Sequence, residues 1–335
     1  MSLPPPRPIA EVEGVDFARF NDEIRPAAQP VVMRGLAAAW PGVQAALQGD
    51  RAIADYLVSF NPARNVGGIM APPGEGGRFF YNADMSGMNF TSRQGRLGVF
   101  LADLLRCADD PRPPAMAVQS ETIAYLLPGF IEANPMPLVP NVPPRIWLGN
   151  RVKVAPHYDL MENIGVCLAG RRRFTVFPPE QLPNLYAGPF ELTPAGTPIS
   201  LVDPDAPDLE RYPRFAEAWA QAQQATLEPG DALYLPYAWW HGVEALKPVS
   251  ILVNYWWNAA PEGSGGGYHA LLHAMLAYRH LPAPARAAWR MMFDHYIFGD
   301  ADPAAHLPAH IKGILGPPSP RLFGQMREML RRVFS

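Results

Sequence analysis

The chain has 335 residues, 48% hydrophobic and 18% charged, which favours a folded globular protein over a disordered one. The formal net charge of −3 excludes a chain-wide attraction to nucleic acid or to anionic membranes. The two cysteines form no CxxC pair, so we expect no disulfide framework and a cytoplasmic location. The N-terminal "MSLPPPRPIAEVEG" has no apolar signal core, and we find no apolar run long enough to span a membrane.

Short apolar runs bounded by proline and glycine fill the first part of the chain. Residues 95–110 carry apolar side chains at helical spacing, which predicts a helix that Pro111 ends. The other elements that we expect here are a strand at 29–36, short helices at 37–47 and 51–60, and a loop entering a strand at 72–82.

The middle of the chain is rich in β-forming residues punctuated by glycine, proline and asparagine. We expect strands at 114–120, 145–150, 152–160, 163–170 and 172–179. A polar, proline-rich segment over 180–226 follows and includes an expected amphipathic helix at 213–225. A "PGD" turn then introduces further strands within 227–236, 238–246 and 249–257.

These strands are too short and too many for one flat sheet, so the economical fold is a jelly roll, mainly β with flanking helices. The character of the sequence changes after the glycine-rich loop at 262–267, where we expect helices. The sequence therefore predicts a β-rich domain over 1–262 and a helical region over 263–335.

One histidine and one aspartate stand two residues apart in an expected strand. His157 and Asp159 therefore project from the same face of that strand. A neighbouring strand can add His241 from the run "AWWHGVEAL". Two histidines and one carboxylate on one face of a metal ion leave open positions for other ligands, the arrangement of ferrous oxygenases. We therefore predict a metal site at His157, Asp159 and His241.

The remaining histidines lie in the helical region. His269 and His273 are four residues apart, but no HExxH glutamate stands between them. We expect these side chains to lie on helix surfaces or in helix packing, together with His280, His295, His306 and His310.

Three arginines begin the expected strand that follows the histidine–aspartate pair. Alternation places Arg172 on one face of the strand, and Arg171 and Arg173 on the other. A bidentate arginine suits the far carboxylate of a keto-acid cosubstrate. Phe174 favours Arg172 as the inward residue, but the equally apolar Phe177 leaves the choice open.

Several of these runs together resemble a known family. The pieces "HYDLMENIGVCLAGRRRFTVFPPEQLPNLYAGP", "EPGDALYLPYAWWHGVEAL" and "VNYWW" resemble the cupin-like JmjC-type oxygenases over about residues 28–258. The resemblance implies a double-stranded β-helix, Fe(II), 2-oxoglutarate and O2, and a hydroxylation reaction. It implies that His157, Asp159 and His241 bind the iron, that Arg172 binds the far carboxylate, and that Asn163 and Asn254 line the cosubstrate site.

The chain departs from the family pattern at two positions. Val154 stands where the family often has a hydroxyl residue, and Ala117 where it often has a tyrosine. Both changes remove a hydroxyl from the expected 2-oxoglutarate site. They motivate an alternative, a cupin module that binds a metal or ligand without turnover. A metal-dependent isomerase or hydrolase on the same barrel is a third class.

The substrate is open to a protein, a peptide or a small molecule, and the near-neutral charge argues against a large nucleic-acid footprint. Four tryptophans near His241 and Asn254 are candidates for the pocket wall or for the core: Trp239, Trp240, Trp256 and Trp257.

The helical region has apolar residues on more than one face of its first two helices. One apolar stripe is enough to dock a helix on its own domain, so the second predicts a homodimer. A hydroxylase of the similar family dimerises through C-terminal helices, so the resemblance implies the same. The alternative is a cap over the chain's own barrel. The apolar residues concerned are Leu271, Leu272, Met275, Leu276, Tyr278, Trp289, Met292, Phe293, Tyr296 and Ile297.

Overall fold

The computed structural model describes residues 3–60, 63–258, 260–261 and 263–333. The chain divides into two compact units, Met1–Trp257 and Asn258–Ser335. The domain boundary that the sequence predicts, between 262 and 263, involves Glu262, which lies outside the described residues. That boundary therefore stays a prediction, and each unit is described by itself.

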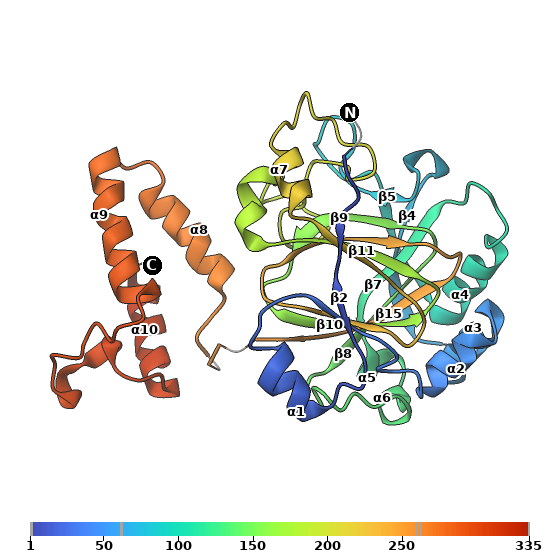
Figure 1. Ribbon diagram of the computed structural model, residues 1–335, viewed down its shortest axis with the longest axis horizontal. Coiled ribbons are helices and arrows are strands. Elements are labelled where there is room, and N and C mark those ends of the chain that lie inside the picture. Colours follow the sequence, from blue (N-terminus) through green and yellow to red (C-terminus); the bar gives the residue numbers. More distant parts are fainter. Residues whose placement is uncertain (1–2, 61–62, 259, 262, 334–335) are drawn as a thin grey trace. The chain divides into compact units, whose positions relative to one another are not determined.

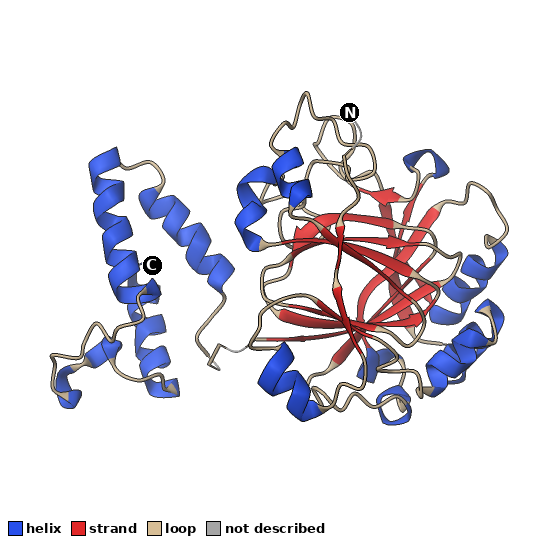
Figure 2. Ribbon diagram, in the orientation of Figure 1, coloured by secondary structure: helices blue, strands red, loops and turns tan. Residues whose placement is uncertain are grey.

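The first unit is built from two β-sheets with helices on the outside (Figures 1 and 2). The six-stranded sheet has the order β1 (Arg7–Pro8), β12 (Gln223–Leu227), β11 (Arg172–Phe177), β14 (Trp240–Ala245), β9 (Lys153–Tyr158) and β5 (Arg78–Phe79). The nine-stranded sheet has the order β2 (Ala10–Val12), β3 (Val31–Met33), β13 (Ala232–Leu235), β10 (Glu162–Ala169), β15 (Ser250–Trp257), β8 (Pro144–Gly149), β7 (Ala115–Thr122), β4 (Asn65–Ala71) and β6 (Thr91–Arg96). The predicted jelly roll with flanking helices is confirmed.

Helices of the first unit cover one face of the nine-stranded sheet. The apolar stripe of α4 buries Leu97, Leu101 and Leu104 in the largest core, as its helical spacing predicts. The same core takes the odd-numbered residues of β15 from Ile251 to Tyr255. Among the described residues, these helices are α1 (Phe17–Arg19), α2 (Pro41–Leu47), α3 (Asp50–Phe60), α4 (Leu97–Arg106), α5 (Ile123–Leu126) and α6 (Phe130–Ala133). Helix α7 (Phe215–Ala220) instead packs in a separate core with Phe177 and Trp240 of the six-stranded sheet.

Strand alternation then turns the even-numbered residues of β15 toward the other sheet. Leu252 belongs to a second core, which also contains Phe174 and Val176 of β11. Polar residues continue the same row of β15 on either side of Leu252. The interior between the sheets is therefore apolar in part, with a polar end that holds the candidate site.

The amphipathic helix predicted at 213–225 is wrong in its second half. Helix α7 ends at Ala220, and residues 223–227 form strand β12. This strand pairs with both β11 and β1, and it buries Ala225 and Leu227 against the inner core. Ladder hydrogen bonds on both sides outweigh the helix preference of a run rich in alanine and glutamine. The sequence also gives no prediction of strand β4, because its two glycines weaken the β pattern.

In the described part of the second unit, the α-helices are α8 (Gly267–Tyr278), α9 (Ala283–Phe293) and α10 (Pro320–Val333). The Tyr278 ring packs against Trp289 and Phe293 at centroid distances of 4.4 and 5.5 Å, so one apolar stripe joins α8 to α9. Other apolar side chains face solvent, including Leu276, Ile297 and Phe298. Within the described residues, we find no helix that is long and apolar enough to cross a membrane.

Candidate metal centre

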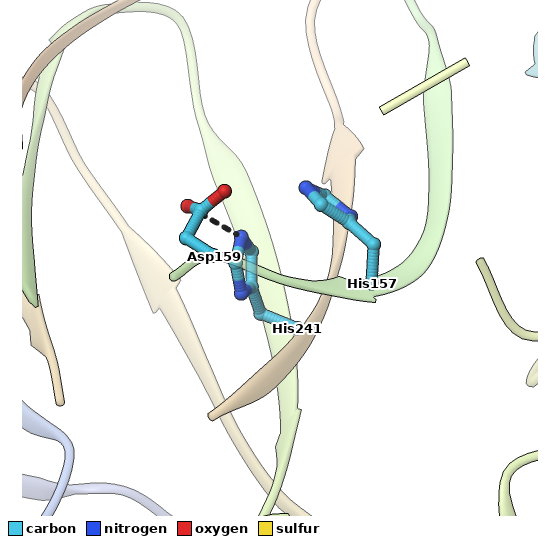
Figure 3. Close-up of side chains that lie close together, drawn as sticks. All are labelled: His157, Asp159 and His241. Carbon is cyan, nitrogen blue, oxygen red and sulfur yellow. Dashed lines mark ion pairs between the residues drawn. The ribbon is translucent and has the colours of Figure 1, made fainter. Parts of the chain in front are cut away.

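Neighbouring strands bring the three predicted ligands together. In the antiparallel pair of β14 and β9, His241 lies directly opposite His157. Asp159 follows the end of β9. The candidate ligand atoms of the three residues all lie within 4.8 Å of one another, and Figure 3 shows the side chains converging. His241 Nε2 lies 3.6 Å from Asp159 Oδ2.

Backbone carbonyls fix the orientation of both imidazoles. His157 Nδ1 lies 3.0 Å from the Ala155 oxygen, and His241 Nδ1 lies 3.1 Å from the Trp239 oxygen. A carbonyl only accepts, so each Nδ1 carries the proton and each Nε2 keeps a free lone pair. Burial, helped by the neighbouring His241, lowers the pKa of His157 to about 4, against the opposing pull of Asp159. The His157 imidazole is therefore neutral at pH 7, as a metal ligand must be.

A chain of amides runs away from the Asp159 carboxylate. Oδ2 of Asp159 accepts from Trp256 Nε1 at 3.1 Å and from Asn163 Nδ2 at 3.3 Å. Asn163 Oδ1 then accepts from Asn254 Nδ2 at 2.7 Å. A carboxylate cannot donate, so it sets the direction of both amides, and Asn254 Oδ1 is left buried with no partner in the described part of the chain.

The three ligand candidates open onto a cavity of about 460 Å³ between the sheets. This volume is within the range of small-molecule sites. Arg172, Asn163 and Asn254 line the same cavity, so it contains all six residues that the sequence predicts for the site.

Arg172 is a buried cation in that cavity, with 6% of its surface exposed. Its Nε donates to Ser250 Oγ at 2.9 Å, and Nη2 donates to the Ser250 carbonyl at 3.3 Å. No acidic side chain among the described residues forms an ion pair with it. Burial lowers the pKa of Arg172 to about 10, so the guanidinium stays charged at neutral pH.

The other two arginines of the run do not line the cavity. Arg171 pairs with Glu228 at 2.6 Å, and Arg173 pairs with Glu244 and, at 3.5 Å, with Asp205. The sequence leaves open which arginine of the strand faces inward. In the fold, Arg172 lines the cavity on the same face as Phe174.

The two departures from the family pattern occupy different places. Val154 lines the cavity and offers no hydroxyl to it. Ala117 is buried in a separate apolar cluster with Ile69 and Phe79 and is not part of the cavity wall. The cavity therefore has no hydroxyl donor at either position.

One of the four candidate tryptophans lines the cavity, namely Trp256. Trp239 and Trp240 are buried in apolar cores, and Trp257 packs against the core under the helices. The histidines of the second unit lie on or near its surface, as expected.

The cavity also contains residues that the sequence did not single out. Trp147 of β8, and Gln119 and Ser120 of β7, line its wall, and Ser250 holds Arg172. The alternation that puts Asn254 inward also puts Ser250 inward, so Ser250 was within reach of the sequence pattern. Trp147 and Gln119 depend on how β7, β8 and β15 pair, which the sequence does not reveal.

Comparison with known proteins places this geometry in context. The model of the cupin-like domain family matches residues 17–263. The chain is 37% identical over 115 residues to human HSPB1-associated protein 1, covering 33% of this chain and 22% of that protein. It is 35% identical over 105 residues to tRNA wybutosine-synthesizing protein 5 of Gallus gallus, covering 31% and 30%.

A third similar protein is the lysine-specific demethylase JMJ31 of Arabidopsis thaliana. The identity is 29% over 133 residues, which covers 39% of this chain and 23% of that protein. The chain therefore matches less than a third of the length of each of these relatives.

Proposed function

Because the chain belongs to the cupin-like domain family, we propose that it is an Fe(II)- and 2-oxoglutarate-dependent oxygenase, and specifically a hydroxylase. The observation that carries this proposal is that the candidate metal ligands and a buried cation line the same cavity. Two imidazoles and a carboxylate converge at one place, and a buried arginine without an acidic partner among the described residues lines the same space.

The donor set suits ferrous iron. Nε2 of His157, Nε2 of His241 and a carboxylate oxygen of Asp159 would hold the ion and leave open positions for smaller ligands. Trp256 and Asn163 already bond the Asp159 carboxylate, so the ligand is oriented before any metal arrives.

The charge of the cavity suits a dicarboxylate. Arg172 has two of its nitrogens on Ser250, which fixes the guanidinium and leaves further N–H groups for an anion. A charged group buried without a counterion is costly, and a carboxylate would remove that cost. We propose that Arg172 binds the far carboxylate of 2-oxoglutarate, with Asn163 and Asn254 beside it.

The proposed roles of the bound groups and of the protein are distinct. Bound iron with 2-oxoglutarate and O2 would supply the oxygen activation that a hydroxylation needs. The protein holds the cosubstrate at Arg172, holds the ligands in fixed rotamers, and excludes bulk water through apolar walls such as Phe174 and Leu252. Gln119 and Ser120 line the cavity from strand β7 and would be available to contact a substrate.

We propose a protein side chain or a small molecule as the substrate class. The name HSPB1-associated protein 1 fits a protein partner, whereas tRNA wybutosine-synthesizing protein 5 is named for a tRNA modification. The net charge of −3 favours the protein or small-molecule class for this chain. Both cysteines are free, which fits the cytoplasmic location that we propose.

A second candidate function is a cupin module that binds a metal or ligand without turnover. Val154 favours it, because this cavity residue supplies no hydroxyl to a cosubstrate.

Anaerobic titration with Fe(II) and then 2-oxoglutarate separates the two functions. An oxygenase gives a weak visible charge-transfer band when both are bound, and on admission of air it releases succinate. A protein that binds Fe(II) but gives neither the band nor succinate is the binding module. Screening a cell lysate for +16 mass changes would then identify the substrate.

A further inference from the structure

The cavity wall contains a hydrogen-bond donor that has no acceptor among the residues the structure describes. Trp147 and Trp256 both line the cavity and meet edge to face, with ring centroids 5.8 Å apart at 89°. The Trp256 indole donates to Asp159. The Trp147 Nε1 is buried and has no partner among the described residues. A buried indole N–H normally finds an acceptor, so the acceptor of Trp147 is expected to arrive with a ligand.

The strand register places Trp147 beside the group that holds Arg172. On β15, Leu252 pairs with Trp147, and Ser250 pairs with Gly149. Ser250 therefore has no side chain opposite it on β8, and Trp147 is its diagonal neighbour on the same face. Diagonal neighbours lie about 7–8 Å apart, within reach of an indole ring.

The Arg172 guanidinium does not fill the needs of a carboxylate by itself. Two of its nitrogens are used by Ser250, and Val154 contributes no donor from β9. A carboxylate has two oxygens with about four lone-pair positions, so it can accept from a second donor in the cavity wall as well as from Arg172. Among the residues that line the cavity, Trp147 has the indole N–H that is buried and unused.

We propose that Trp147 Nε1–H donates to the far carboxylate of 2-oxoglutarate beside Arg172, and so replaces the hydroxyl donors that Val154 and Ala117 lack. The inference rests on the proposed function. It makes Trp147 a cosubstrate-binding residue that selects for dicarboxylates, because a keto acid without the far carboxylate has nothing to place against the indole.

The first test is Trp147→Phe, which removes the N–H and keeps an aromatic ring. Binding is measured by calorimetry with Zn(II) as a redox-inert metal. The dissociation constant of 2-oxoglutarate should rise roughly tenfold or more, the loss expected for a hydrogen bond to a charged group. The affinities for Zn(II) and for pyruvate, which has no far carboxylate, should stay unchanged. Trp219→Phe is the matched control, because that indole donates to the Pro4 carbonyl instead.

The second test follows ligand binding in the natural protein, and the variant serves only to assign one resonance. The chain has eight tryptophans, so an indole ¹H–¹⁵N spectrum of the Zn(II)-loaded protein is small enough to follow. The resonance that is missing in Trp147→Phe belongs to Trp147. It should move downfield on addition of 2-oxoglutarate and stay in place on addition of pyruvate.

The outcomes separate the two levels of the proposal. If the natural protein binds 2-oxoglutarate but neither the Trp147 resonance nor the Trp147→Phe affinity responds, Trp147 is not a cosubstrate ligand and the oxygenase proposal stands. If the natural protein binds no 2-oxoglutarate at all, the proposed function itself is wrong and this inference fails with it.

Discussion

At the scale of single residues, Asp159 has the largest number of roles in the candidate site. Its carboxylate lies near His241 and accepts hydrogen bonds from Trp256 and Asn163. The histidines, by contrast, are each fixed by one backbone carbonyl. Removal of Asp159 therefore takes away a ligand and the acceptor that orients its neighbours.

We predict that Asp159→Ala abolishes stoichiometric Fe(II) binding while cooperative thermal unfolding persists. Metal content after anaerobic reconstitution measures the first property, and calorimetry measures the second. Asp55→Ala is the control, since Asp55 forms an exposed ion pair with Arg51 on α3. An Asp159→Ala protein that retains one Fe(II) per chain would show that the metal site lies elsewhere.

The three consecutive arginines offer an internal comparison. Arg172→Ala should weaken 2-oxoglutarate binding by about two orders of magnitude, since a charge-assisted contact contributes roughly 2–4 kcal/mol once its partner is left unpaired. Arg171→Ala and Arg173→Ala should leave the affinity nearly unchanged, because their ion pairs lie outside the cavity. Equal losses in all three variants would contradict a specific role for Arg172.

The low pKa of His157 predicts acid sensitivity of the metal-free protein. Its pKa is about 4 in the folded state and about 6.5 in an unfolded chain, so the unfolded state binds more protons between these values. Stability should therefore be complete above about pH 6.5 and fall as the pH drops toward 4. The loss at pH 5 is on the order of 1–2 kcal/mol.

Denaturant unfolding at pH 7 and pH 5 measures this loss. His157→Gln should reduce the difference between the two pH values, whereas His310→Gln, a change at an exposed residue of the second unit, should not. An unchanged difference in His157→Gln would mean that other groups cause the acid sensitivity.

At the scale of elements, β15 joins the two ends of the site. Its inward row holds Arg172 through Ser250 and reaches Asp159 through Trp256, with Asn254 between them. The outward row packs in the core under the helices. One strand therefore orients both the Arg172 guanidinium and the Asp159 carboxylate, and a shift of its register would displace both together.

Ser250→Ala tests this strand without touching the ligands. Arg172 Nε loses its 2.9 Å acceptor and keeps the carbonyl contact, so the guanidinium should become less well oriented. We expect 2-oxoglutarate binding to weaken roughly five- to tenfold, about 1 kcal/mol, with Fe(II) affinity unchanged. Isothermal titration checks both, with Ser59→Ala on α3 as the control. Unaltered cosubstrate affinity would argue against this support.

The sequence predicts features that depend on one strand better than features that depend on pairing between distant strands. His157 and Asp159 follow from alternation within one strand, so the local pattern sufficed to propose them, whereas alternation alone left the choice among the three arginines open. Trp147 and Gln119 reach the cavity only through pairing between strands distant in the chain. Residues 223–227 became a strand for the same reason, because partners on both sides overrode the local helix preference.

At the scale of the whole molecule, the second unit presents apolar surface that its own packing leaves uncovered. Tyr278, Trp289 and Phe293 join α8 to α9, yet Leu276 and Phe298 are 75% and 73% exposed. Apolar side chains on a second face call for a partner. We propose that a second copy of this chain supplies it.

Light scattering at micromolar concentration should give twice the chain mass of 36.9 kDa. Leu276→Glu combined with Phe298→Glu should reduce the mass to that of one chain and leave Fe(II) binding intact. Leu47→Glu, at an exposed leucine of the first unit, should keep the dimer. A mass of one chain for the natural protein would favour the alternative, a helical cap on the chain's own barrel.

Through the hydrogen bonds from Asp159 to Asn254, one carboxylate sets which amide atoms of the cavity wall donate and which accept. Asn163 and Asn254 could each turn by 180° at no cost in shape, and the carboxylate alone chooses between the two arrangements. A leucine at position 159, which branches at Cγ as aspartate does but accepts no hydrogen bond, would erase that choice. A wall atom that only accepts could then become a donor, although no backbone had moved. A substitution at position 159 could thus change which ligands the cavity accepts without changing the shape of the cavity.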